Sequence, residues 1–70
     1  MYEMDLRIRK QIGADLRLER NLRRLTQEKV ARLVGISGAK LWKLENGRIA
    51  NPQSRDIQAV RDVLHRYQVK

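Results

Sequence analysis

The sequence predicts an all-α bundle of four to five short helices, and three observations lead to that prediction. Apolar residues recur at three- and four-residue spacing along most of the chain. Glycine and proline are sparse and divide the chain into short segments of this kind. No alternating run of β-branched residues is present, apart from a short YQVK stretch at 67–70.

The first helix is expected to begin at Ile8 or Ile12 and to end at Leu25. Residues 1–7 either extend it or fray from it. One apolar stripe, at i+4 spacing, consists of Ile8, Ile12 and Leu16. A second stripe, about 100° round the helix axis, consists of Leu18, Leu22 and Leu25.

Two shorter helices follow, each with its own start and stop signals. One is expected over Gln27–Val34, with Thr26 as its N-cap and Gly35 as a left-handed stop. The next begins at Ser37, a second N-cap residue, and ends at Gly47.

The last helix is expected to begin at Gln53 or Ser54, just after Pro52. Its inward face is expected to consist of Ile57, Val60, Leu64 and Tyr67. A chain of 70 residues makes one small domain, which buries only about 60% of its unfolded surface and so has a thin core.

Composition excludes several classes of function. Without cysteine, neither disulfides nor thiolate metal ligands can form, and the lone His65 cannot make a metal site or a catalytic pair. No nucleophile accompanies a base, and no phosphate-binding glycine loop precedes a helix. We therefore predict a protein that is not an enzyme and that takes no metal and no cofactor.

The charge points to a polyanionic partner. The chain carries 16 basic and 8 acidic residues, a net charge of +8 spread over both halves. Such a balance favours nucleic acid or an acidic membrane surface. No apolar run approaches the roughly 20 residues of a membrane span, so we expect no membrane partner and a cytoplasmic, nucleoid-associated protein.

A tight turn at Gly35-Ile36-Ser37 should hold the two short helices at a steep angle. Here the sequence resembles the Cro and phage-repressor family of helix-turn-helix domains, the xenobiotic-response-element type. The resemblance covers about residues 12–64. Besides this turn, it is carried by Ile12-Gly13, Arg20, Thr26-Gln27, Val30-Ala31, Leu41, Leu44-Glu45-Asn46-Gly47 and Pro52.

The resemblance implies a lambda-repressor-like bundle, formed by a single domain over 1–70 with the helix-turn-helix at about 26–46. Residues 1–10 and 68–70 are then extensions for partner contact. A recognition helix at about 37–46 would enter the major groove of double-stranded DNA. The residues expected at DNA are Gln27, Ser37, Gly38, Ala39, Lys40, Lys43, Asn46 and Arg48.

Individual roles within that set differ. Gln27 should meet the sugar-phosphate backbone, and Lys43 should meet either a guanine edge or a phosphate. Gly38 and Ala39 offer close backbone approach instead of long polar side chains. Trp42 is expected at the rim of the core, on a deoxyribose, or against a protein partner.

Four further residues complete the set of expectations. The resemblance implies a buried structural ion pair between Arg20 and Glu45. Leu18 and Leu22 lie on an outward stripe, where they are either ordinary exposed leucines or a contact patch for a second subunit or another protein.

Three positions depart from the family pattern. Glu19 stands where an apolar residue usually packs inward. Arg24 stands where glycine is common, and Arg61 where a small apolar residue is preferred.

The sequence therefore predicts a sequence-specific transcriptional regulator of prokaryotic or phage type. We expect a repressor that binds DNA as a homodimer. Two alternatives stay open: a DNA-binding antitoxin that also neutralises a protein toxin, and a phage recombination accessory protein. Too few stacking aromatics are present to favour RNA.

Overall fold

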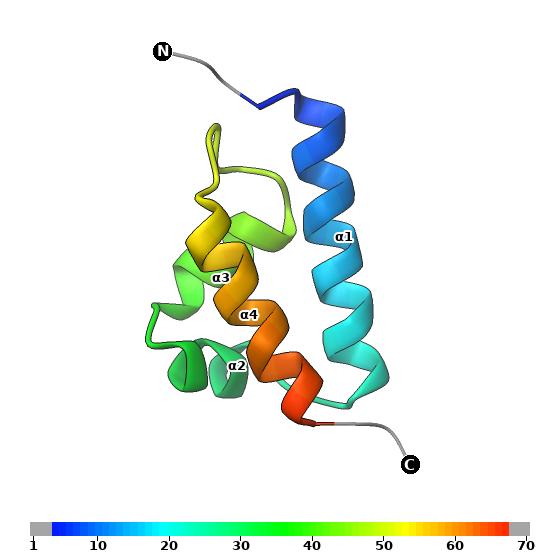
Figure 1. Ribbon diagram of the computed structural model, residues 1–70, viewed down its shortest axis with the longest axis vertical. Helices are drawn as coiled ribbons and strands as arrows, with labels where there is room; N and C mark the ends of the chain where they lie inside the picture. The colour runs from blue at the N-terminus through cyan, green and yellow to red at the C-terminus, as the bar shows by residue number, and fades with distance from the viewer. Residues whose placement is uncertain (1–3, 68–70) are drawn as a thin grey trace.

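The computed structural model describes residues 4–67 and contains four helices there: α1 (Leu6–Leu22), α2 (Gln27–Val34), α3 (Gly38–Glu45) and α4 (Ser54–Arg66). The all-α prediction is confirmed. In Figure 1, α1 runs along one side of the molecule beside α4, α3 passes behind α4, and α2 lies on the side of α4 away from α1. Helix α3 packs against α1 and α2, and α2 also packs against α4.

Helix α1 begins earlier than the apolar pattern predicted. Asp5 caps it, because its carboxylate accepts a hydrogen bond of 2.8 Å from the main-chain N–H of Arg7. Ile8 is 55% exposed, so its assignment to the inward stripe was wrong. Ile12 and Leu16 do face inward, and Leu16 is fully buried.

The end of α1 also differs from the prediction. The helix stops at Leu22, and Leu25 lies beyond it while remaining buried in the core. Arg24 has a φ of 56°, the left-handed conformation that glycine often supplies at this position. The chain turns here and enters the capping residue Thr26 in an extended conformation.

Helices α2 and α3 have the predicted N-caps, whereas α3 ends at Glu45, with Asn46 as its C-cap, and not at Gly47 as expected. The hydroxyl of Thr26 accepts from the N–H of Lys29 at 3.1 Å, and that of Ser37 accepts from the N–H of Lys40 at 3.0 Å. Gly35 ends α2 with a φ of 87°, as expected of a left-handed stop. Only two residues, Ile36 and Ser37, then separate Gly35 from α3.

The core is aliphatic, as a chain without phenylalanine requires. All four helices and the turn after α1 contribute to it, and its buried members are Leu16, Leu25, Val30, Ala31, Leu41, Leu44, Val60, Val63 and Leu64. Val63 was not among the residues predicted to face inward, because the i+3 and i+4 steps of the apolar pattern run from Ile57 through Val60 to Leu64. Tyr67 caps the C-terminus of α4 and packs against the core edge.

Close approach of α1 to the end of α3 depends on Gly13. This glycine is buried within α1, and a Cβ atom there would overlap the carbonyl oxygens of Leu44 and Glu45. Gly47 makes a second close approach, since a Cβ atom built on it would come within 2.7 Å of Lys10 Cγ. These two glycines let α1 lie directly against the end of α3 and the turn after it.

The predicted partner-contact extensions are only partly visible. Residues 1–3 and 68–70, including most of the YQVK stretch, lie outside the described residues. Within the described part, the N–H of Met4 donates to the carbonyl of Ala50 at 3.1 Å, which ties the start of the chain to the loop before α4. No helix among residues 4–67 is long and apolar enough to cross a membrane.

Candidate nucleic-acid interface

Helix α3 has two contrasting faces. Leu41, Leu44 and Glu45 are buried and hold the helix against the body of the protein. The opposite face is exposed and consists of Gly38, Ala39, Lys40, Trp42 and Lys43, with the cap Ser37 at its start. An exposed helix face of this kind, short in side chains at its N-terminal end, can approach a groove of double-stranded DNA.

The predicted ion pair lies beneath this face and is confirmed. Arg20 donates from Nε to Glu45 Oε2 at 2.8 Å and from Nη2 to Oε1 at 3.0 Å. Its Nη1 donates to the carbonyl of Leu25 at 2.8 Å, so the same side chain also fixes the turn after α1. The side chain of Glu45 is 1% exposed and that of Arg20 is 11% exposed. Paired bonds between planar groups make this the strongest kind of protein ion pair.

Gln27 joins the same network. Its amide nitrogen donates to Glu45 Oε1 at 3.0 Å, which connects the start of α2 to the end of α3. The amide group has a second N–H that this bond does not use. Gln27 therefore holds α2 against α3 and sits at an N-terminal helix end that favours negative charge.

The two lysines of α3 differ in their surroundings. Lys40 Nζ lies 3.1 Å from a carboxylate oxygen of Asp56 in the first turn of α4. Lys43 is exposed and has no ion-pair partner among residues 4–67. Of the two predicted DNA lysines, only Lys43 is thus free of a competing carboxylate in the described part of the chain.

Trp42 is not among the buried core residues of the described chain, and the three expected roles for it (core rim, deoxyribose contact, protein contact) stay open. Its side chain is 46% exposed, and the guanidinium carbon of Arg48 lies 5.7 Å from the centre of its ring. Such a spacing is that of a cation–π contact. Asn46 lies between them in sequence, and its amide donates to the carbonyl of Trp42 at 2.8 Å.

A basic hollow adjoins the end of α3, and sequence reasoning missed it. Its lining residues are Lys10, Ala14, Arg17, Glu45, Asn46 and Arg48. Lys10, Ala14 and Arg17 follow one another at i, i+4 and i+7, the spacing that places residues on one face of a helix. That spacing was visible in the sequence, but the contact of this face with the turn after α3 was not.

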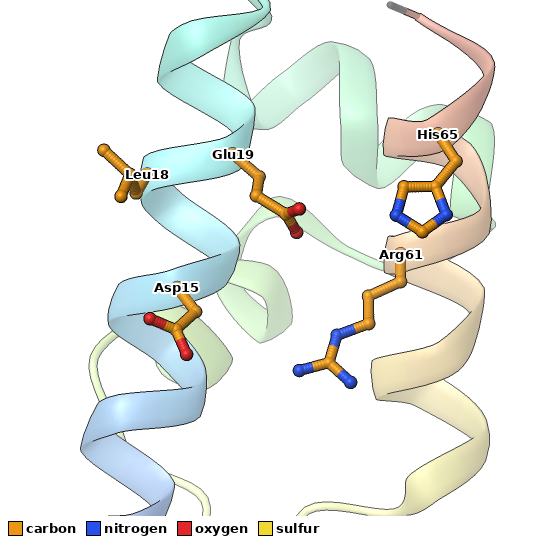
Figure 2. A pocket seen from close by; sticks show the side chains of 5 residues that line it. All are labelled: Asp15, Leu18, Glu19, Arg61 and His65. Atoms are coloured by element: carbon orange, nitrogen blue, oxygen red, sulfur yellow. The ribbon is translucent and has the colours of Figure 1, made fainter.

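A second hollow lies between α1 and α4 (Figure 2). Asp15 and Glu19 line it from α1, with the Glu19 carboxylate pointing toward α4, and the side chains of Arg61 and His65 line it from α4. Glu19 and Arg61 are two of the three departures from the family pattern. They lie across one gap from each other, although no ion pair within 4.0 Å joins them.

Leu18 and Leu22 are both exposed on α1, at 58% each. Leu18 lines the rim of the hollow between α1 and α4. Their outward orientation is as the sequence predicted. Among residues 4–67, no three His, Cys, Asp or Glu side chains converge in a way that could hold a metal ion.

Comparison with known families gives a match that covers most of the chain. The model of a helix-turn-helix domain matches residues 11–69. No characterised protein and no solved structure gave a match. Helix-turn-helix domains bind DNA, which indicates DNA binding and a role in transcription regulation for this chain. The match spans α1 from its second turn through α4, and the chain belongs to the helix-turn-helix domain family.

Proposed function

We propose that this protein is a transcriptional repressor that recognises specific sites in double-stranded DNA and binds them as a homodimer, with α3 in the major groove. The observation that carries the proposal is the two-faced α3, anchored through Leu41 and Leu44 and exposed from Ser37 to Lys43. The net charge of +8 supplies the attraction to phosphate. No enzymatic activity forms part of the proposal.

Specificity in this scheme comes from a few side chains. Lys43 is the one long, cationic side chain on the exposed face without a carboxylate partner in the described chain, and lysine donates well to guanine O6 and N7. Gly38 and Ala39 let the helix approach the base edges, and Ala39 offers its methyl group to thymine. Gln27, Lys40, Asn46 and Arg48 would mainly meet phosphates.

A salt titration of duplex binding tests the proposal. Four phosphate contacts would give a slope of about −3.6 in log K against log salt. Lys43→Ala should weaken binding to a selected site by about 1–3 kcal/mol and relax preference at one base position, while leaving weak binding to random duplex nearly unchanged. An affinity that is independent of salt would contradict the proposal.

The homodimer is tested separately. Two copies on a palindromic site should place their half-sites about one helical turn, ~34 Å, apart. Light scattering with and without a palindromic duplex should report a two-to-one complex. Changing the half-site spacing by half a turn should abolish cooperative binding, because the second α3 would then face away from its groove.

A second candidate function is supported by Leu18 and Leu22. Both leucines are 58% exposed on one helix and form an apolar surface that a protein partner would cover. In this second function the protein is an antitoxin that binds its promoter and also a protein toxin. Co-purification of a protein partner that is lost with Leu18→Ser and Leu22→Ser, while DNA affinity stays unchanged, would favour this function. A recombination accessory protein would instead show strong DNA bending in the same complexes.

A further inference from the structure

The hollow between α1 and the end of α3 concentrates positive charge. Lys10 and Arg17 enter from α1, and Arg48 enters from the turn after α3. No carboxylate of residues 4–67 forms an ion pair with any of these three. All three are exposed residues.

The one acidic residue in the lining does not cancel this charge. Both oxygens of Glu45 are already engaged, Oε2 by Arg20 and Oε1 by Arg20 and Gln27. The carboxylate is therefore neutralised from the other side by a guanidinium group. An anion in the hollow would meet the combined field of Lys10, Arg17 and Arg48.

The shape of the hollow is fixed by close packing. Because Gly13 has no side chain, α1 lies directly on the carbonyls at the end of α3. Because Gly47 has none either, the backbone of Lys10 lies 3.1 Å from the position that a Cβ atom of residue 47 would take. Asn46 is held by its bond to the carbonyl of Trp42, and Arg48 lies over the Trp42 ring. Two of the lining residues are thus held in place before any ligand binds, which lowers the entropy cost of binding.

We propose that Lys10 and Arg17, together with Arg48, bind a DNA backbone phosphate beside the groove occupied by α3. This extends the DNA interface from the helix-turn-helix onto α1, and it rests on the proposed function. The hollow shares Asn46 and Arg48 with the residues expected at phosphates, so a strand leaving the groove at the C-terminal end of α3 passes its opening. The ligand chemistry is that of a phosphate oxyanion with guanidinium and ammonium donors.

The experiment compares three single variants of the full chain: Lys10→Gln, Arg17→Gln and Arg66→Gln. Each removes one positive charge from an exposed residue, and glutamine keeps the aliphatic stem of Lys10 that lies over Gly47. Arg66 is the matched control, because it lies far from the hollow. It belongs to the last turn of α4, which lies near the C-terminal end of α1, whereas Lys10 lies toward the N-terminal end of α1 (Figure 1). Melting temperatures establish that all variants remain folded.

The salt dependence of binding to a generic duplex gives the result. Removing one of the three cations at this phosphate should reduce the slope of log K against log salt by up to about 0.9. Between about 50 and 200 mM salt, the loss of affinity should then be smaller than that of the wild type by a factor of up to about 3.5. We expect this for Lys10→Gln and Arg17→Gln, and an unchanged slope for Arg66→Gln. Equal slopes in all three variants and the wild type would overturn the inference while leaving the proposed function standing.

Two other outcomes would also overturn it. If the wild-type protein fails to bind any duplex, the proposed function and this inference fail together. If inorganic phosphate raises the melting temperature of the wild type but not of Lys10→Gln at equal ionic strength, and duplex slopes are unchanged, the hollow takes a free anion and not DNA.

Discussion

Arg20 and Glu45 are separated by 25 residues in the sequence and meet in a two-bonded ion pair, with N···O distances of 2.8 and 3.0 Å. The pair joins α1 to α3, and its members also hold Leu25 and Gln27. It fixes the angle between the exposed helix and the rest of the protein. Stability and the orientation of α3 therefore depend on the same four side-chain hydrogen bonds.

Replacing Glu45 by alanine should strongly destabilise the protein. The change would leave the guanidinium of Arg20, 11% exposed, without its partner, at a cost of about 3–5 kcal/mol. Total stability for a chain of this size is about 4–10 kcal/mol, so the loss is large. Thermal unfolding followed by circular dichroism measures this loss of stability.

Asp62→Ala is the control, because the side chain of Asp62 accepts a hydrogen bond only from Gln58 at the surface. Its loss should cost less than about 0.5 kcal/mol. An unchanged melting temperature for Glu45→Ala would refute the structural role.

Gly13→Ala should destabilise the protein although alanine is the better helix former. The added methyl group would overlap the carbonyls of Leu44 and Glu45 and push α1 away from α3. Overpacking of this kind costs about 1–3 kcal/mol. Gly38→Ala is the matched control, since nothing lies within 4 Å of its Cβ position and α3 should gain up to about 1 kcal/mol of helix propensity. Melting curves that move in the same direction for both variants would contradict the packing argument.

The sequence was most informative where structure is set by neighbouring residues. Thr26, Ser37 and Gly35 act through bonds or dihedral angles within a few positions, so both N-caps and the turn between α2 and α3 were predicted to the residue. The pair of Arg20 and Glu45 was also predicted, but through a family resemblance and not through spacing.

Features that depend on how helices meet were not predictable in this way. The apolar character of Ile8 placed it on an inward stripe, yet nothing in the described chain covers that part of α1 and the side chain is 55% exposed. The contact between Lys40 and Asp56 and the basic hollow around Lys10 and Arg17 both require residues from two helices, and their registers follow only from tertiary packing.

Arg24→Gly should stabilise the protein. Arg24 adopts a φ of 56°, which costs a residue with a Cβ atom about 1 kcal/mol relative to glycine. Removing the strain should raise the melting temperature by about 4–8 °C for a protein of this size. Arg24→Ala loses the same charge but keeps the Cβ atom and should show no gain. If alanine and glycine raise the melting temperature equally, charge repulsion and not backbone strain would be the cause.

Trp42 should report DNA binding directly. Because its side chain is 46% exposed, its fluorescence should have the red-shifted maximum of a solvated indole and should be quenched readily by acrylamide. Added duplex should shield Trp42 from the quencher in the wild type. A blue-shifted emission that duplex does not alter would instead place the ring in the core.

Asp56→Asn should strengthen DNA binding by releasing Lys40. The lysine lies on the exposed face of α3 but points its ammonium group at Asp56, 3.1 Å away, so a phosphate must compete with that carboxylate. The two side chains are 45% and 17% exposed, and a pair with one end in solvent is worth about 1 kcal/mol, so the competition is weak and the gain modest. The ammonium group of Lys40, once released, should steepen the slope of log K against log salt by up to about 0.9.

Asp62→Asn is the control. It removes an equal charge from the exposed surface of α4, at a residue that pairs with no lysine in the described chain. If both variants bind DNA more tightly by the same factor, the effect comes from net charge alone. If only Asp56→Asn binds more tightly, the ion pair with Asp56 holds Lys40 away from DNA in the wild type.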